Sequence, residues 1–164
     1  MGANAQPHTG ETFAAVAPPD CGLALAIDAI GDRWTLMVLR EALYGVRRFD
    51  QIQQDTGMPR SVLSKRLSML VSLGVLNKLP YREQGKRLRH EYALTPRGQE
   101  LMVAFVALME WGEKNADGAR RPRLRLYDTE SGDRVHVRFV TDGGTVVDSL
   151  DRVRARITRE QAGR

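Results

Sequence analysis

Hydroxyl-bearing and basic side chains recur at helical spacing between Pro59 and Leu73. At about 100° per residue, one face of such a helix is polar, and its members are Ser61, Ser64, Lys65 and Ser68. The opposite face consists of Leu63, Leu67 and Leu70. Short hydroxyls and a long cation suit base edges and phosphates in the major groove of DNA. The segment from Arg60 to Lys78 contains four basic residues and no acidic one. This pattern indicates either a DNA-reading helix or a solvent-exposed helix that lacks acidic residues.

A second basic cluster separates these alternatives. Residues 75–81 and 92–94 have strand-like apolar patterns, and the segment between them forms a predicted hairpin tip. Its basic residues are Arg82, Lys86, Arg87 and Arg89. Two cationic elements that flank one groove favour DNA binding over a merely solvated helix.

The predicted DNA contacts divide into two groups. Those at base edges are Ser61, Ser64, Lys65 and Ser68. Those that neutralise phosphates, including the residues of the hairpin, are Arg60, Arg66, Lys86, Arg87 and Arg89.

Caps and apolar periodicity mark the helices that must position these side chains. Asp20 and Asp32 are predicted N-caps, and Thr95 followed by Pro96 is a further helix start. The predicted helices span about residues 20–30, 32–43, 49–57, 59–73 and 95–114. The last of these has an apolar surface wide enough to predict a partner subunit, formed by Leu101, Val103, Phe105, Val106, Leu108 and Trp111.

The order of helix, short helix, turn, helix, basic hairpin and helix resembles the HxlR-type winged helix-turn-helix regulators, a bacterial and archaeal family. The stretches that carry the resemblance are Ile30–Leu36, Arg48–Ile52, Val62–Leu67 with Leu70, Gly74 and Val75, and Glu91–Gly98. The resemblance implies a homodimer on a pseudopalindromic operator in double-stranded DNA, with the 59–73 helix in the major groove and the hairpin as wing. It also implies that the helices after Asp20 and after Thr95 build the dimer interface.

The predicted fold class is therefore mainly α with small β, a winged helix-turn-helix followed by a small β-rich C-terminal appendage. Residues 1–19 are predicted to be a flexible tail, 20–116 the DNA-binding and dimerisation domain, and 117–164 an extension of unknown role. Strands are expected around Leu124–Tyr127, Val135–Phe139 and Val146–Val147. Arg152–Arg159 is a candidate final helix.

Three residues are candidates for sensing a signal. Cys21 lies at a predicted helix N-terminus, where the helix dipole favours a thiolate, and some regulators that this chain resembles sense oxidants with a cysteine near the first helix. A half-buried structural cysteine is the alternative. Trp34 and Trp111 are candidates to line a small-molecule pocket, although aromatic residues at helical spacing are more often core.

Composition limits the other possibilities. The net charge of +5 on 164 residues favours a polyanionic partner, and the single cysteine excludes an internal disulfide or a cysteine-based zinc site. No metal or cofactor, membrane span or signal peptide is predicted, and the expected location is the cytoplasm. An enzyme with Cys21 as nucleophile would need a nearby base, and the three histidines are scattered, so no catalysis is expected. A winged helix that docks onto protein is the main alternative, and an RNA-binding winged helix is a weaker one.

Overall fold

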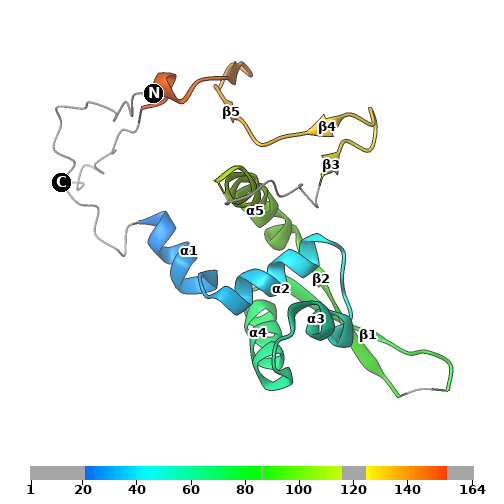
Figure 1. Ribbon diagram of the computed structural model, residues 1–164. Coiled ribbons are helices and arrows are strands. Elements are labelled where there is room, and N and C mark those ends of the chain that lie inside the picture. Colours follow the sequence, from blue (N-terminus) through cyan, green and yellow to red (C-terminus); the bar gives the residue numbers. More distant parts are fainter. Residues whose placement is uncertain (1–20, 86, 116–124, 155–164) are drawn as a thin grey trace, which may run out of the picture. The chain divides into compact units, whose positions relative to one another are not determined.

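The computed structural model describes residues 21–85, 87–115 and 125–154, which belong to two compact units (Figure 1). The first lies within Gly22–Arg123. Its elements are α1 (Gly22–Ile30), α2 (Arg33–Leu43), α3 (Phe49–Thr56), α4 (Arg60–Ser72), β1 (Leu76–Tyr81), β2 (Arg89–Leu94) and α5 (Pro96–Asn115). The fold is mainly helical with small sheets, as predicted. The predicted domain boundary after residue 116 lies outside the described residues.

Local sequence explains where these helices begin and end. Asp32 is the N-cap of α2, where its carboxylate accepts hydrogen bonds from the backbone N–H groups of Trp34 (3.1 Å) and Thr35 (3.2 Å). Gly57 ends α3 in the left-handed conformation, with φ of 65°, a region that glycine enters without steric cost. Asp20, the other predicted aspartate cap, lies outside the described residues.

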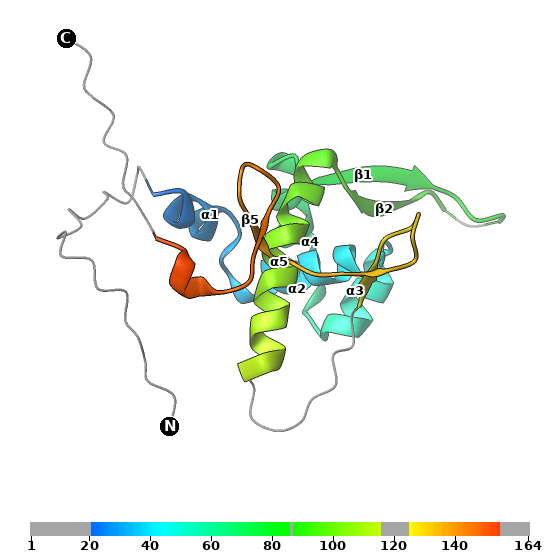
Figure 2. The ribbon, with the colours of Figure 1, turned by 90° about the horizontal axis from the view of Figure 1, so that it is seen from above.

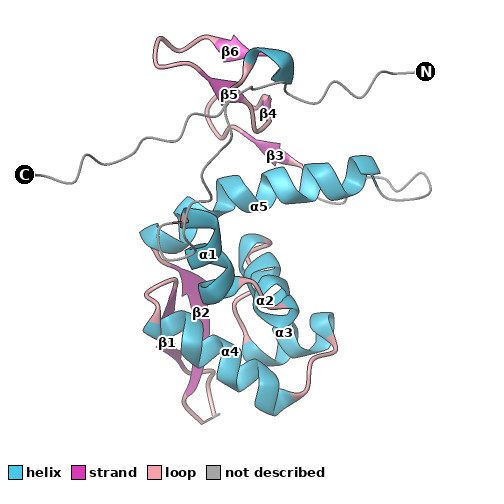
Figure 3. Ribbon diagram, turned by 90° about the vertical axis from the view of Figure 1, so that its left-hand side faces the viewer, coloured by secondary structure: helices cyan, strands magenta, loops and turns pink. Residues whose placement is uncertain are grey.

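The core lies where α4 packs against α2 and α3 (Figure 3). Leu63, Leu67 and Leu70 are fully buried, which confirms the predicted apolar face of α4. They pack with Val38 and Leu39 of α2 and with further buried residues, Ile52, Met58, Val75, Leu76 and Phe105. Burial of these side chains fixes which face of α4 remains exposed.

Strands β1 and β2 pair antiparallel from Leu76↔Leu94 to Tyr81↔Arg89. The N–H of Tyr92 donates to the carbonyl of Arg47 (2.8 Å), and Arg48 forms an antiparallel β-bridge with Glu91. The segment before α3 therefore pairs with β2. The hairpin projects beyond the helices, and the described residues between its strands, 82–85, 87 and 88, lie toward its tip (Figure 2). The structure therefore has the three-helix core and protruding wing of a winged helix-turn-helix.

Asp32→Ala should lower the free energy of unfolding by about 1 kcal/mol at neutral pH, the usual effect of losing an N-cap. Partial burial raises the pKa of Asp32, but hydrogen bonds from Thr35 and Trp34 and the charge of Arg66 outweigh it and lower the pKa below its ordinary value. A lowered pKa means that this stabilisation is present above about pH 4 and is lost as the pH falls through the folded-state pKa. Urea unfolding at pH 7 and pH 3 should show the difference from wild type shrinking in acid. The exposed Asp28→Ala, which removes no cap, is the control, and an equal effect there would contradict the assignment.

The second unit contains two small hairpins and a helical turn. Its elements are β3 (Leu126–Tyr127) paired with β4 (Arg134–Val135), β5 (Phe139–Val140) paired with β6 (Val146–Val147), and a 3₁₀ helix at Leu150–Arg152. The predicted strand through Val137 is wrong at that residue, because the chain there passes from one hairpin to the next. A helix starting at Arg152 is also wrong, since helical geometry ends there and Val153 is extended. Leu124 and residues 155–159 lie outside the described residues.

Candidate nucleic-acid interface

The outward face of α4 holds the side chains predicted to reach DNA bases. Ser61, Ser64, Lys65 and Ser68 are all exposed, because burial of the leucine face directs them to solvent. Lys65 forms no ion pair with any described residue. Helix α3 precedes α4, with the turn at residues 57–59 between them, and the two helices pack side by side (Figure 3). The face therefore offers three hydroxyls and one unpaired cation to a groove.

Arg66 has a different position from its neighbour Lys65. Its side chain is half-buried, and its Nε lies 3.3 Å from Oδ1 of Asp32. This ion pair ties α4 to the N-terminus of α2. Sequence position alone predicted a phosphate contact for Arg66, whereas the structure directs its charge to a carboxylate within the protein.

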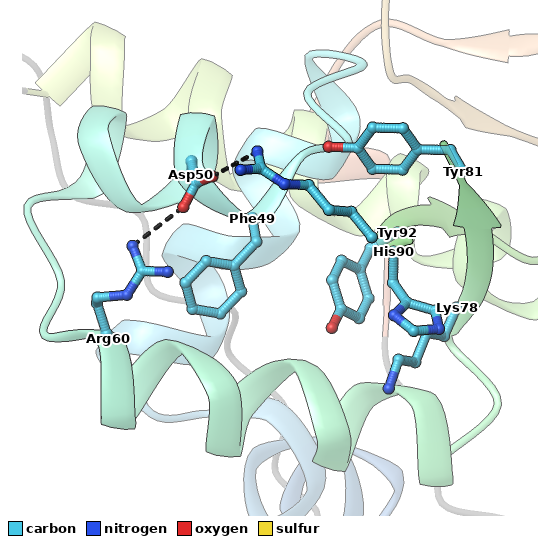
Figure 4. Close-up of a pocket in the computed structure, with 8 residues that line it drawn as sticks. Phe49, Asp50, Arg60, Lys78, Tyr81, His90 and Tyr92 are labelled. Atoms are coloured by element: carbon cyan, nitrogen blue, oxygen red, sulfur yellow. Dashed lines mark hydrogen bonds and ion pairs between the residues drawn. The ribbon is translucent and has the colours of Figure 1, made fainter. Parts of the chain in front are cut away.

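Asp50, near the start of α3, connects α4 to the β1–β2 hairpin through two ion pairs (Figure 4). Its Oδ1 lies 3.0 Å from Nη1 of Arg60 in α4, and its Oδ2 lies 3.3 Å from Nη1 of Arg89 in β2. The Arg60 guanidinium also lies 4.8 Å from the centre of the Phe49 ring. Two predicted phosphate-binding arginines thus share one carboxylate, which sequence reasoning had not singled out.

Further arginines beside the wing are also paired. Nη1 of Arg48 lies 2.8 Å from Oε1 of Glu83, and Cζ of the same guanidinium lies 4.9 Å from the centre of the Tyr81 ring. Arg47 lies 3.7 Å from Glu91. At the hairpin tip Arg82 and Arg87 are exposed, while Lys86 lies outside the described residues. The wing therefore presents exposed arginines at its tip and carboxylate-paired arginines near its base.

Lys78 of β1 is a cation that the sequence analysis did not assign. It pairs in register with Tyr92, and Pro80 pairs with His90. Because side chains alternate along a strand, Lys78, His90 and Tyr92 share one face of the hairpin. The alternation of side chains along β1 would have predicted this shared face only if the register between the two strands had been known.

The candidate sensing residues occupy separate places. Cys21 is half-buried immediately before α1. Trp34 packs against the core cluster, with the Arg33 guanidinium 5.6 Å from its ring centre. Trp111 is 68% exposed on α5. Among the described residues, no three His, Cys, Asp or Glu side chains gather to hold a metal ion, and none of the described helices is long and apolar enough to cross a membrane.

Comparison with known proteins identifies this arrangement. Residues 29–120, more than half of the chain, match the model of the HxlR-like helix-turn-helix family. The chain belongs to this family. An uncharacterized HTH-type transcriptional regulator of Mycobacterium tuberculosis (strain CDC 1551 / Oshkosh) is 42% identical over 115 residues, which are 70% of this chain and 72% of the relative. This HxlR-like protein is therefore a DNA-binding transcriptional regulator of the winged helix-turn-helix type.

Solved structures extend the similarity beyond the family core. PA1607, a candidate transcription factor, has a TM-score of 0.68 and 31% identity, with 85% of this chain and 95% of that protein covered. PA1374 of Pseudomonas aeruginosa, another candidate transcription factor, has a TM-score of 0.55 and 26% identity, with 88% and 95% covered. Residues 1–120 are less than 85% of the chain. The similarity to both structures therefore reaches into the C-terminal extension of this HxlR-like regulator.

Proposed function

We propose that this HxlR-like regulator binds a pseudopalindromic operator as a homodimer, with α4 in the major groove and the β1–β2 hairpin as wing. The observation that carries the proposal is the exposed, acid-free face of α4, made of Ser61, Ser64, Lys65 and Ser68. Hydroxyls and an unpaired lysine can contact base edges, whereas arginines at the wing tip neutralise phosphates without reading sequence. Control of transcription then follows from occupancy of a promoter region, without catalysis.

Exposed apolar side chains on α1 and α5 support the homodimer. None of the residues of α1 is buried, although Leu23, Leu25 and Ile27 are large and apolar. On α5, Leu108 and Trp111 are 60% and 68% exposed. Exposed apolar side chains gathered on a helix are typical of interaction sites, and a second copy of the chain would bury them while placing two α4 helices on two half-sites.

A redox or small-molecule signal is the proposed means of control. Cys21 adjoins α1, so oxidation there would alter the helix that the proposed dimer buries. Trp34 and Trp111 remain the candidates for an effector pocket, which would form only where the dimer brings elements together. The location of such a regulator, with its DNA, would be the cytoplasm.

Lys65→Ala and Arg87→Ala should each weaken DNA binding and flatten its salt dependence by about one unit in the slope of log affinity against log salt. Fluorescence anisotropy at several salt concentrations measures this, with duplex DNA from the region upstream of the protein's own coding sequence and a scrambled duplex. Lys65→Ala should also reduce the preference for the native duplex, whereas Arg87→Ala should weaken both duplexes equally. Lys114→Ala, at the exposed last turn of α5, is the control for loss of one positive charge.

The same titration tests the other readings. Equal, weak binding of both duplexes by the wild-type protein would contradict sequence-specific regulation and favour a winged helix that docks onto protein. Unchanged affinity and slope in both variants would show that the assigned surface is wrong. Repetition with peroxide tests the role of Cys21, because Cys21→Ser should abolish any loss of binding that oxidation causes.

A further inference from the structure

A pocket of about 280 Å³ lies between the start of α3, the start of α4 and the hairpin (Figure 4). Its charged side chains are Asp50, Arg60, Lys78 and Arg89, and the others are Phe49, Tyr81, His90 and Tyr92. The residues come from α3 and from both elements of the proposed DNA-binding surface, α4 and the hairpin. Only Arg60 and Arg89 among them were predicted to contact DNA.

The pocket has an excess of positive charge. Three permanent cations face a single carboxylate, and that carboxylate is shared by Arg60 and Arg89 at 3.0 and 3.3 Å. Lys78 forms no ion pair within the described part of the chain. An anion that entered this pocket would therefore meet one free ammonium and two guanidinium groups held in place by Asp50.

We propose that this pocket binds a backbone phosphodiester of the operator and that Asp50 is the resident counter-ion that the phosphate replaces. The inference rests on the proposed function, because DNA must lie on α4 and the wing together. A strand that passes from the major groove filled by α4 to the groove met by the wing crosses the space between them, where the pocket lies. The aromatic ring of Phe49 holds the Arg60 guanidinium from one side and leaves its N–H groups available to a new acceptor.

The exchange of Asp50 for phosphate is physically reasonable because these ion pairs are weak. The side chains of Asp50, Arg60 and Arg89 are 57%, 65% and 53% exposed, and exposed ion pairs contribute little stability. A DNA phosphate gains in addition from the release of condensed counter-ions. Since phosphate contacts carry no sequence information, Asp50 should lower the affinity for every duplex by a similar factor.

Asp50→Asn tests the counter-ion role, because it keeps the size of the side chain and removes its charge. We expect affinity for native and scrambled duplexes to rise by about three- to tenfold at low salt, with a steeper salt dependence. Asp55→Asn is the matched control: Asp55 lies on the same helix, but its carboxylate accepts from Gln51 instead of pairing with an arginine. Equal effects of the two variants, or weaker binding by Asp50→Asn, would overturn the proposal.

Lys78→Gln tests the pocket without touching Asp50. Affinity for both duplexes should fall by about three- to tenfold, and the salt slope should lose about one unit, whereas Lys114→Gln should change neither. Circular dichroism would confirm that the variants fold. If the wild-type protein distinguishes native from scrambled DNA while Lys78→Gln matches Lys114→Gln, the pocket is wrong and the regulator function stands. If the wild-type protein does not distinguish them, the proposed function itself fails.

Discussion

Combining Leu108→Arg with Trp111→Arg should turn a dimer into a monomer and weaken binding to an operator with two half-sites by a factor on the order of 10² to 10⁴. Residues three apart are neighbours on a helix, and these two are largely exposed in the single chain. In a two-fold interface each substitution occurs twice, so four guanidinium groups would replace four apolar contacts. The loss of affinity follows because each α4 would then bind its half-site alone.

Sedimentation equilibrium gives the oligomeric state, and anisotropy with the two-half-site duplex gives the affinity. Gln99→Arg is the matched control, because Gln99 precedes Leu108 by nine residues and lies on the opposite side of α5. It should leave both measurements unchanged. A double variant that remains dimeric would exclude Leu108 and Trp111 from the interface. The exposed apolar residues of α1 would then become the next surface to test.

The sequence predicts which face of α4 is buried, because the determinants of that face are local. Alternation of leucine with serine and lysine in residues 61–70 decides which face of α4 is buried, and the structure confirms the buried leucines. Asp32 and Gly57 are similarly local signals, since a cap or a left-handed residue acts within a few positions. Patterns of this range can be recognised without knowing the tertiary fold.

The ion pairs around the interface could not be predicted in this way. Asp50 and Arg89 are 39 residues apart, and Asp50 and Arg60 are 10 apart, so their meeting depends on how α3, α4 and β2 pack. Arg66 illustrates the same limit: it follows Lys65 directly, yet its charge faces Asp32 on another helix. A count of basic residues identifies a cationic surface, whereas the fold decides which cations are already paired.

The C-terminal extension shows a different limit. Apolar alternation and Gly-containing turns predicted strands, and Gly132 and Gly144 do have positive φ at two turns. Each strand nevertheless has only two residues, and large apolar side chains such as Phe139 and Leu150 are exposed. Two-stranded hairpins of this size are only marginally stable alone. Their local pattern therefore predicts the turns, but it does not predict which surface would cover their apolar side chains.

Gly98→Ala should destabilise the first unit by about 2 kcal/mol, although alanine favours helices more than glycine does. A Cβ at Gly98 would lie 2.2 Å from the backbone carbonyl oxygen of Val75. That oxygen cannot easily move, because it accepts a hydrogen bond from the N–H of Thr95 (3.0 Å). The Thr95 hydroxyl in turn donates to the carbonyl of Gly74 (2.6 Å) and accepts from the N–H of Gly98 (3.0 Å). The close approach of α5 to Val75, directly before β1, therefore requires a residue without a side chain at position 98.

Gly112→Ala provides the comparison within the same helix. Nothing lies within 4 Å of a Cβ built there, so the gain in helix propensity should remain and raise stability by about 0.5–1 kcal/mol. Urea unfolding at one fixed protein concentration would measure both variants, since stability of a dimer depends on concentration. Opposite signs would separate steric exclusion at Gly98 from the general preference for alanine. A Gly98→Ala protein at least as stable as wild type would show that α5 can shift away from Val75, and the rigid seating of α5 on the hairpin would then be wrong.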